Sequence, residues 1–462
     1  MAARPLLERQ TNHRLEALIE EAGFSNASLA RSVNSRGEKL GISLRYDKTS
    51  VSRWLRGQRP RARTAAIIAE VLSERLDRTV SLEEIGMAFG RNLAGAVGLQ
   101  FASDIRGVVE QACSLWASDA DPRGVFFGSA IAASALIGPS RDWLITPPDT
   151  KVARSGGSRV GDGDVAAVNA ATHALSDLDQ RFGSGHLRSI VVHYLNTFVS
   201  GLLTGSYDES TGRALFGAVA RLNYLAAYMA VDTGLLSLAQ RYYVQALRLS
   251  QVAGDRLLGG CVLACGMGHL APALGHPREV VQLALAARGG AEREETPMSR
   301  ALFLAAEARG YALLRDNEAC EVAIGRAIEA LEQAKPGTEP EWLHYFDMAY
   351  LAGEFAHCYR DLGQPELSAH WAERAHAEHP ELAVRRRVID LLLLASARIE
   401  LDEVEEGRSA ATRAIELLSG VRSSICAEYV RDFQRLLHQK GLRSTLGDFR
   451  EQLESCRTAT SR

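Results

Sequence analysis

The stretch Arg45-Tyr-Asp-Lys-Thr-Ser-Val-Ser-Arg-Trp-Leu-Arg-Gly-Gln-Arg-Pro-Arg-Ala-Arg63 predicts a short helix with one apolar face and one basic face. Asp47 suits the N-cap position, because its carboxylate can accept the free amide hydrogens of a first helical turn. Val51, Trp54 and Leu55 follow the i, i+3, i+4 spacing of a single helix face. We therefore expect these three side chains to hold the helix to the body of its domain.

The opposite face of this expected helix carries hydroxyl and basic side chains. They are Lys48, Thr49, Ser52, Arg53 and Arg56. Gly57 and Pro60 follow and are typical of a helix end. A helix with one buried ridge and a basic back suits the major groove of DNA, where such side chains reach base edges and phosphates. The alternative is a solvated amphipathic helix whose basic face contacts only water.

Short helical patterns also surround this segment. Arg14–Ala22 predicts one helix, and Ser25 can cap a second, which the interval Ser35–Leu44 separates from the basic helix. Ala65–Leu76 predicts another, and Ser81–Ile85 begins with a capping box and predicts a fifth. We expect a domain of five short helices over residues 1–90.

This arrangement resembles the phage-repressor (Xre/Cro-type) helix-turn-helix domain. In that family the pattern S-R-x-x-x-G closes the recognition helix, and Ser52, Arg53 and Gly57 match it. One departure is the interval before the recognition helix, which is much longer here than the tight turn of the family. The resemblance implies binding to double-stranded DNA.

Charge is distributed unevenly along the chain. The net charge of −3 by itself argues against a nucleic-acid binder. Between Arg31 and Arg63, however, ten basic residues face only Glu38 and Asp47, so this window carries +8 and the remainder −11. A basic patch on an acidic body indicates a nucleic-acid contact surface, whereas the alternative is a solvated run of charge.

Length and composition set the broad class of protein. A chain of 462 residues exceeds what one core usually serves, so we expect two or more domains. Seven widely spread cysteines form no disulfide framework and suit a reducing cytosol. The N-terminus lacks a signal pattern, and the apolar run Val125–Ile137 is shorter than the about 20 residues that span a bilayer. We expect a cytoplasmic protein in which that run is a buried helix.

The middle of the chain has the features of a connector. Residues 91–163 are punctuated by proline, with a helix expected at Val108–Trp116. The glycine- and serine-rich segment Arg154–Gly163 predicts a flexible linker. A third region, residues 164–462, then carries successive helix patterns.

Internal repetition characterises this third region. A small-x-x-x-medium-x-x-Ala pattern, which lets two helices cross closely, recurs five times from Ala239, Val280, Cys320, Ser368 and Gly407. The spacings of 41, 40, 48 and 39 residues exceed the 34 of a strict tetratricopeptide repeat. In the first helix of a pair, Ala308 with Tyr311 and Ala356 with Tyr359 fit the accompanying small-then-aromatic pattern. The repeats therefore resemble degenerate tetratricopeptide helix pairs, and the alternative is a helical bundle without a groove.

The predicted fold class is all-α: an N-terminal helix-turn-helix domain followed by an α-solenoid. A solenoid has a concave face that suits peptides, proteins or small ligands. Residues expected to line it are Asn223, Tyr224, Tyr228, His269, Tyr311, Tyr345, Tyr350 and His357.

Candidate chemical sites are few. Cys261, Cys265 and His269 stand at i, i+4 and i+8 of an expected helix, where they suit either a metal or redox site or ordinary core packing. One straight helix cannot complete a tetrahedral metal site, so we expect no metal. No phosphate-binding glycine loop, nucleophile elbow or paired-carboxylate signal occurs, so we expect no enzyme, no catalytic residue and no cofactor.

The order of the two regions resembles the peptide-sensing regulators of Gram-positive bacteria. It resembles more closely the actinobacterial Xre/tetratricopeptide regulators of sporulation and antibiotic production, the Nsd-type negative regulators. Leu44–Gly57, Pro139–Ile145 and Ala239–Leu249 carry that resemblance. It implies a transcriptional regulator of development or secondary metabolism, whose repeats mediate dimerisation and reception of a peptide, protein or small-molecule signal.

In the DNA-binding hypothesis, two groups of residues have different roles. Base edges are contacted by Lys48, Thr49, Ser52 and Arg53, and phosphates by Arg56, Gln58, Arg59, Arg61 and Arg63. A homodimer is expected, because one such domain makes too few contacts for specific binding. The alternative function is a scaffold that does not bind DNA and docks another regulator through its helical repeats.

Overall fold

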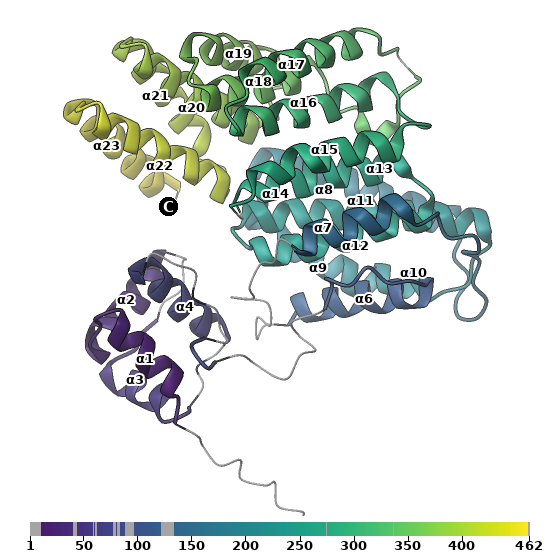
Figure 1. Cartoon of the computed structure of the whole chain (residues 1–462), viewed down its shortest axis with the longest axis horizontal. Helices are drawn as coiled ribbons and strands as arrows, with labels where there is room; N and C mark the ends of the chain where they lie inside the picture. The colour runs from purple at the N-terminus through teal and green to yellow at the C-terminus, as the bar shows by residue number, and fades with distance from the viewer. Residues whose placement is uncertain are drawn as a thin grey trace, which may run out of the picture. The chain divides into compact units, whose positions relative to one another are not determined.

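The structure is a computed structural model of the whole chain (Figure 1). It describes residues 11–39, 44–58, 60, 62–76, 80, 84–87, 97–121, 134–273, 275–335 and 337–460. Within these residues the fold is all-α, with two isolated β-bridges and no strand. Two compact units form: residues 1–97 with 114–132, and residues 98–113 with 133–462.

The first unit is a small helical domain with its own core. Its helices are α1 (His13–Glu21), α2 (Asn26–Lys39), α3 (Lys48–Leu55) and α4 (Ala62–Leu76). Leu15, Leu29, Val33 and Ile68 are completely buried between them. Ser25 caps α2 as expected, exchanging side-chain and backbone hydrogen bonds with Ser28.

One boundary in this unit differs from the sequence prediction. Residues 35–39, expected to lie between helices, extend α2 instead. Gly37 is buried within this extension, so the helix continues to Lys39 despite the low helix propensity of glycine. Of the expected fifth helix, Ser81–Ile85, only residues 84 and 85 are described, and they form a turn.

The second unit begins with helices that precede the repeats. They are α6 (Ile105–Asp119), whose last six residues group with the first unit, α7 (Ser134–Ile145), α8 (Asp162–Phe182), η1 (Ser184–His186), α9 (Arg188–Tyr194), η2 (Leu195–Val199) and α10 (Ser200–Leu203). α6 covers the helix expected at Val108–Trp116. In the expected buried run Val125–Ile137, residues 125–133 lie outside the described residues, and the rest begins α7.

The segment expected to be a flexible linker is ordered. Arg154 pairs with Tyr207 and Arg159 with Ser206 in isolated β-bridges. Gly157 has a φ of +85°, and a Cβ there would lie 3.1 Å from the carbonyl oxygen of Thr204. Gly157 therefore allows close backbone packing at this point of the segment.

The repeats are antiparallel helix pairs, visible as stacked layers in Figure 1. The pairs begin with α11 (Glu209–Asp232) and α12 (Leu236–Ala253), and continue with α13 (Arg256–Cys261), η3 (Val262–Met267) and α14 (Gly268–Ala273) against α15 (Pro277–Ala291). Next come α16 (Pro297–Leu313) with α17 (Asn317–Glu332), η4 (Glu341–Leu343), α18 (Met348–Leu362) with α19 (Pro365–Glu378), α20 (Val384–Glu400) with α21 (Val404–Leu418), and α22 (Ser424–Gln439) with α23 (Arg443–Thr460). The predicted helical-repeat solenoid is confirmed.

All five small-residue patterns fall on second helices of pairs, namely α12, α15, α17, α19 and α21. Their defining residues are buried, as close helix crossing requires. The Ser368 hydroxyl donates to the carbonyl oxygen of Ala356 at 3.0 Å, the residue twelve positions earlier on the first helix. A larger side chain at Ser368 would hold the two helices apart.

Two π-helical segments interrupt otherwise continuous helices. η2 joins α9 to α10, and η3 joins α13 to α14. At Gly266 in η3, a Cβ would lie 2.5 Å from the Tyr243 ring and 3.2 Å from the Tyr224 ring. The absence of a side chain at Gly266 thus lets two tyrosines pack on the backbone of this turn.

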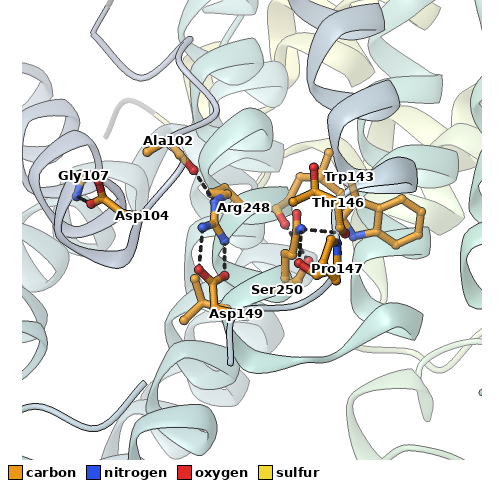
Figure 2. Close-up of polar contacts among 12 residues, drawn as sticks. Ala102, Asp104, Gly107, Trp143, Thr146, Pro147, Asp149, Arg248 and Ser250 are labelled. Atoms are coloured by element: carbon orange, nitrogen blue, oxygen red, sulfur yellow. Dashed lines mark hydrogen bonds and ion pairs between the residues drawn. The ribbon is translucent and has the colours of Figure 1, made fainter. Parts of the chain in front are cut away.

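α12 is surrounded on all sides. Every residue from Leu238 to Val252 is buried, including polar and charged ones. Its polar side chains hold residues 98–102 and 146–149 through hydrogen bonds. Figure 2 draws the bonds that Arg248 makes to Ala102 and Asp149. Arg248 donates to both carboxylate oxygens of Asp149, at 2.6 and 2.9 Å, and to the carbonyl oxygen of Ala102 at 2.6 Å. Residues expected to form a connector therefore pack on the repeats.

The solenoid closes on itself through a buried ionic cluster. Arg385 on α20 donates to Asp179 on α8 at 2.7 Å and lies 3.5 Å from Asp232 on α11. Ser423, just before α22, donates to Asp232 as well. The amide of Arg422 donates to the carbonyl oxygen of Phe182 at 2.8 Å. We call Arg385, Asp179, Asp232 and Ser423 the closure cluster; it joins the last repeats to the first helices.

Among the described helices, α11 is long and apolar enough to cross a membrane by length and composition. In the structure, 72% of its apolar window is buried within the protein. That burial is what a central helix of a repeat stack shows.

Candidate functional site

The first candidate site is α3, whose start follows from local sequence. The carboxylate of Asp47 accepts from the Ser50 amide at 2.8 Å, and the Ser50 hydroxyl lies 3.4 Å from the Asp47 amide. This capping box satisfies amides that the helix leaves free. The Ser50 hydroxyl and backbone amide, by hydrogen bonding, hold the pKa of Asp47 below 3.8. The predicted N-cap is confirmed.

Aromatic and amide contacts anchor α3 in its domain. Val51 and Trp54 are buried, and Tyr46 packs edge-on against the Trp54 indole with ring centroids 5.1 Å apart. The Asn34 side chain on α2 donates to the Tyr46 carbonyl oxygen at 2.8 Å and accepts from its amide at 2.9 Å. The backbone entering α3 is thereby tied to α2, so the helix has a defined orientation within the unit.

The outward face of α3 presents most of the predicted DNA-contacting residues. Lys48, Thr49, Arg53, Arg56 and Gln58 are exposed. Ser52 is half-buried: its hydroxyl donates to the Lys48 carbonyl oxygen at 3.0 Å and accepts from Asn26 at 3.4 Å. Arg59 and Arg61 lie outside the described residues, as does the side chain of Arg63.

Not every basic residue between Arg31 and Arg63 is free of an ion pair within the protein. Arg36 forms ion pairs with Glu70 and Glu74 on α4, each at 3.0 Å. This arginine therefore fastens α2 to α4, and the basic character of the surface rests on α3 and its flanks.

The second candidate site is a group of polar and aromatic side chains on first helices of the repeats and on the turn that precedes α18. We call it the inner cluster: Tyr224, Cys261, Cys265, His269, Arg309, Tyr345, Tyr350, Glu354 and Arg386. The Arg386 guanidinium lies 4.0 Å from the centroid of the Tyr350 ring. Tyr345 contacts Tyr350 edge-on with centroids 5.6 Å apart. Side chains from five helix pairs thus meet on one face.

Charge within the inner cluster centres on Glu354. Its carboxylate lies 3.8 Å from His269 Nε2 and 3.5 Å from Arg309 Nε. Desolvation opposes its ionisation, but His269, Arg309 and Arg386 outweigh it and lower the pKa of Glu354 to about 2. This buried carboxylate is therefore ionised at neutral pH.

Four of the residues predicted to line the concave face belong to the inner cluster: Tyr224, His269, Tyr345 and Tyr350. The others lie elsewhere. Tyr228 packs under the Arg385 guanidinium at 4.6 Å, and His357 pairs with the Tyr429 hydroxyl at 3.2 Å. Tyr311 lies near Glu307 and Asp316 instead: desolvation and these two carboxylates raise the pKa of its hydroxyl. Asn223 is wholly buried and donates to the Tyr242 carbonyl oxygen at 2.7 Å, so its assignment to a ligand face is wrong.

Sequence reasoning missed the charged members, Arg309, Glu354 and Arg386. A usable signal was present, because Tyr350 and Glu354 stand at i and i+4 on a first helix, as Cys261 and Cys265 do. Across the described part of the chain, no three His, Cys, Asp or Glu side chains gather as metal ligands.

The chain thus has an all-α repeat fold with a separate small helical unit. In comparisons with known proteins, the family model described as the SP15 N-terminal domain matches residues 15–88, which run from within α1 to beyond α4. No curated protein matches the chain.

Proposed function

We propose that the protein binds double-stranded DNA through α3 and acts as a transcriptional regulator. The observation that supports this is a capped, anchored helix whose exposed face carries Lys48, Thr49, Arg53 and Arg56. α2 and α3 would act as the helix-turn-helix pair, with α3 as the recognition helix. The match of a family model to residues 15–88 supports treating this unit as a domain of its own.

The chemistry of the side chains assigns some of them to base edges of DNA and others to phosphates. Lys48, Thr49, Ser52 and Arg53 would reach base edges, with Arg53 suited to the two acceptors of guanine. Arg56 and Gln58, with the arginines that follow, would contact phosphates. The Ser52 hydroxyl would exchange its contact with Asn26 for one to DNA.

Three further parts of the proposal rest on the resemblance to Xre/tetratricopeptide regulators of the Nsd type. These are a homodimer formed by the repeats, an effector at their inner face, and a role in development or secondary metabolism in the cytoplasm. The inner cluster supports the second of these, since aromatic and charged groups converge there.

The test is binding of the full-length protein to duplexes selected from a random pool, measured by anisotropy across a range of salt concentrations. A regulator gives a steep negative slope, about −0.9 for each phosphate neutralised. Arg53→Ala should cost about 1–3 kcal/mol at one base position and relax specificity there. Arg56→Ala should weaken all sequences alike.

Arg408→Ala is the matched control, because Arg408 is an exposed arginine on α21 in the other unit. It should leave affinity unchanged. Absence of binding and of any salt slope would favour the scaffold function. Equal losses from Arg53→Ala and Arg408→Ala would overturn the role given to α3.

A further inference from the structure

A cavity of about 370 Å³ lies where the start of α16, the end of α17 and the turn before α18 meet. These three helices are neighbours in the repeat stack (Figure 1). The volume falls within the range of about 300–1,000 Å³ that small-molecule sites occupy in proteins. Phe346, which lines the cavity, packs against Tyr350 with ring centroids 5.2 Å apart. The cavity therefore adjoins the inner cluster, although no residue of that cluster lines it.

Apolar side chains form most of the wall of this cavity. Met298, Leu331 and Met348 are half-buried, so each keeps part of its surface available to an occupant. Phe346 is completely buried and fixes the turn that carries the exposed His344. Methionine side chains are flexible and polarizable, and they adapt to apolar groups of varied shape. We therefore expect an occupant with an apolar body.

The charged residues of the lining are both acidic. Glu332 and Asp347 are exposed, and neither lysine nor arginine occurs among the described residues that line the cavity. Arg300, on the first turn of α16, pairs instead with Glu295 at 2.7 Å. Lys335, which follows the end of α17, is exposed and lies outside the lining. Nothing in the lining thus neutralises the two carboxylates.

A third carboxylate adjoins the cavity. Glu339 accepts from the Met298 amide through Oε1 at 3.3 Å, whereas its Oε2 is buried without a hydrogen-bond partner among the described residues. Asp347 accepts from the Tyr350 amide at 2.9 Å. These two contacts occupy amides at the starts of α16 and α18, which would otherwise attract an anion. The surroundings of the cavity therefore favour a cation.

We propose that this cavity binds a small organic cation, in which an apolar body carries an ammonium or amidinium group. The body would contact Met298, Leu331 and Met348, and the cationic group would lie toward Glu332 and Asp347. Removal of apolar surface from water supplies affinity for the body. The carboxylates select the sign of the charge.

The experiment compares two probes of similar size and opposite charge, benzyltrimethylammonium and phenylmethanesulfonate. Each is titrated into the full-length protein at low salt, and its dissociation constant is measured by saturation-transfer NMR. We expect benzyltrimethylammonium to bind about tenfold more tightly or better, with a preference that declines as salt is added. Equal affinities, or binding of neither probe, would overturn the proposal. Binding of a lysine-flanked leucine peptide without binding of the small cation would overturn it in favour of a protein partner.

A matched pair of variants tests the role of the carboxylates. Glu332→Gln should weaken binding of benzyltrimethylammonium about threefold, because it removes one exposed carboxylate from the lining. Glu318→Gln removes the same charge from an exposed position at the other end of α17 and should leave the affinity unchanged. Equal affinities of these two variants would overturn the assigned site.

A third variant tests the apolar wall. Met298→Lys places an ammonium group in the lining and should abolish binding of benzyltrimethylammonium, with the fold checked by circular dichroism. Binding at the wild-type affinity by the folded variant would overturn the assigned site. No arm depends on DNA binding, so this proposal and the proposed function fail independently.

Discussion

Individual side chains near the inner cluster hold unusual charge states. Desolvation, followed by the charges of Arg386, His376 and Arg387, lowers the pKa of His379 to about 3. Desolvation also raises the pKa of Asp390 well above its usual range, although Arg386 and Arg387 oppose this. His379 Nε2 lies 3.6 Å from Asp390, so the contact joins two uncharged groups rather than an ion pair.

The lowered pKa of His379 contributes a loss of stability in mild acid, opposite in sign to the contribution of the raised pKa of Asp390. Since the pKa of His379 is about 3 in the fold and about 6.5 when unfolded, only the unfolded chain takes up a proton as the pH falls below 6.5. His379 thus lowers the free energy of unfolding by about 2 kcal/mol between pH 7 and pH 5. His379→Gln should remove that part of the pH dependence, measured by urea unfolding. His438→Gln, at an exposed position on α22, should not.

Only some of the roles of individual residues could be predicted from the sequence. The roles of Asp47, Val51 and Trp54 were predictable because a cap and a helical ridge are local patterns. The charge of Glu354 was not, because its partners His269 and Arg309 come from other repeats.

At the scale of elements, α12 contacts a neighbouring repeat on one side and the segment before α6 on the other. On one side Tyr243 packs against η3 and Tyr224, with ring centroids of the two tyrosines 5.7 Å apart. On the other, Gln245 donates to the carbonyl oxygens of Gly98 and Gln100, at 2.8 and 3.1 Å. Residues 98–102 and 146–149 were expected to belong to a connector because prolines punctuate that region, and no local pattern there predicts the hydrogen bonds to α12.

Removing one partner of the buried Arg248–Asp149 pair should release this packing. Arg248 is 4% exposed and Asp149 15%, so Asp149→Ala would leave a desolvated guanidinium without a counter-charge. Such a loss costs about 3–5 kcal/mol, toward the lower end here because Asp149 is partly solvated. Tryptic cleavage after Lys151 and Arg154 should accelerate at least tenfold.

The comparison variant is Asp142→Ala, which removes the partner of the exposed Arg141 on α7. Exposed pairs contribute about 0–1 kcal/mol, so cleavage should stay at the wild-type rate. Equal cleavage of both variants would show that the Arg248–Asp149 pair does not hold the segment.

At the scale of the whole second unit, the repeats were predictable and their closure was not. The spacing of small residues predicts a close crossing between two helices that are neighbours in sequence. Arg385 and Asp179, by contrast, are 206 residues apart, and no local pattern pairs them. Gly183 takes a φ of +77° at this junction, where a Cβ would lie 2.5 Å from the Arg422 carbonyl oxygen.

Opening the closure cluster should therefore affect both ends of the unit. Arg385→Met leaves Asp179 and Asp232 buried without their cation, which costs about 3–5 kcal/mol. Hydrogen exchange should rise in both α8 and α22. Arg374→Met, at an exposed pair on α19, should leave exchange unchanged. Faster exchange confined to α20 would contradict a closing role.

Open repeat arrays can be shortened from an end, since each module depends only on its neighbours. Here the contacts from Phe182 to Arg422 make the final repeats a support for the earliest helices. Truncation at the C-terminus would thus unmask carboxylates on α8 and α11, and a viable shorter homologue would have to replace Arg385 and both aspartates together.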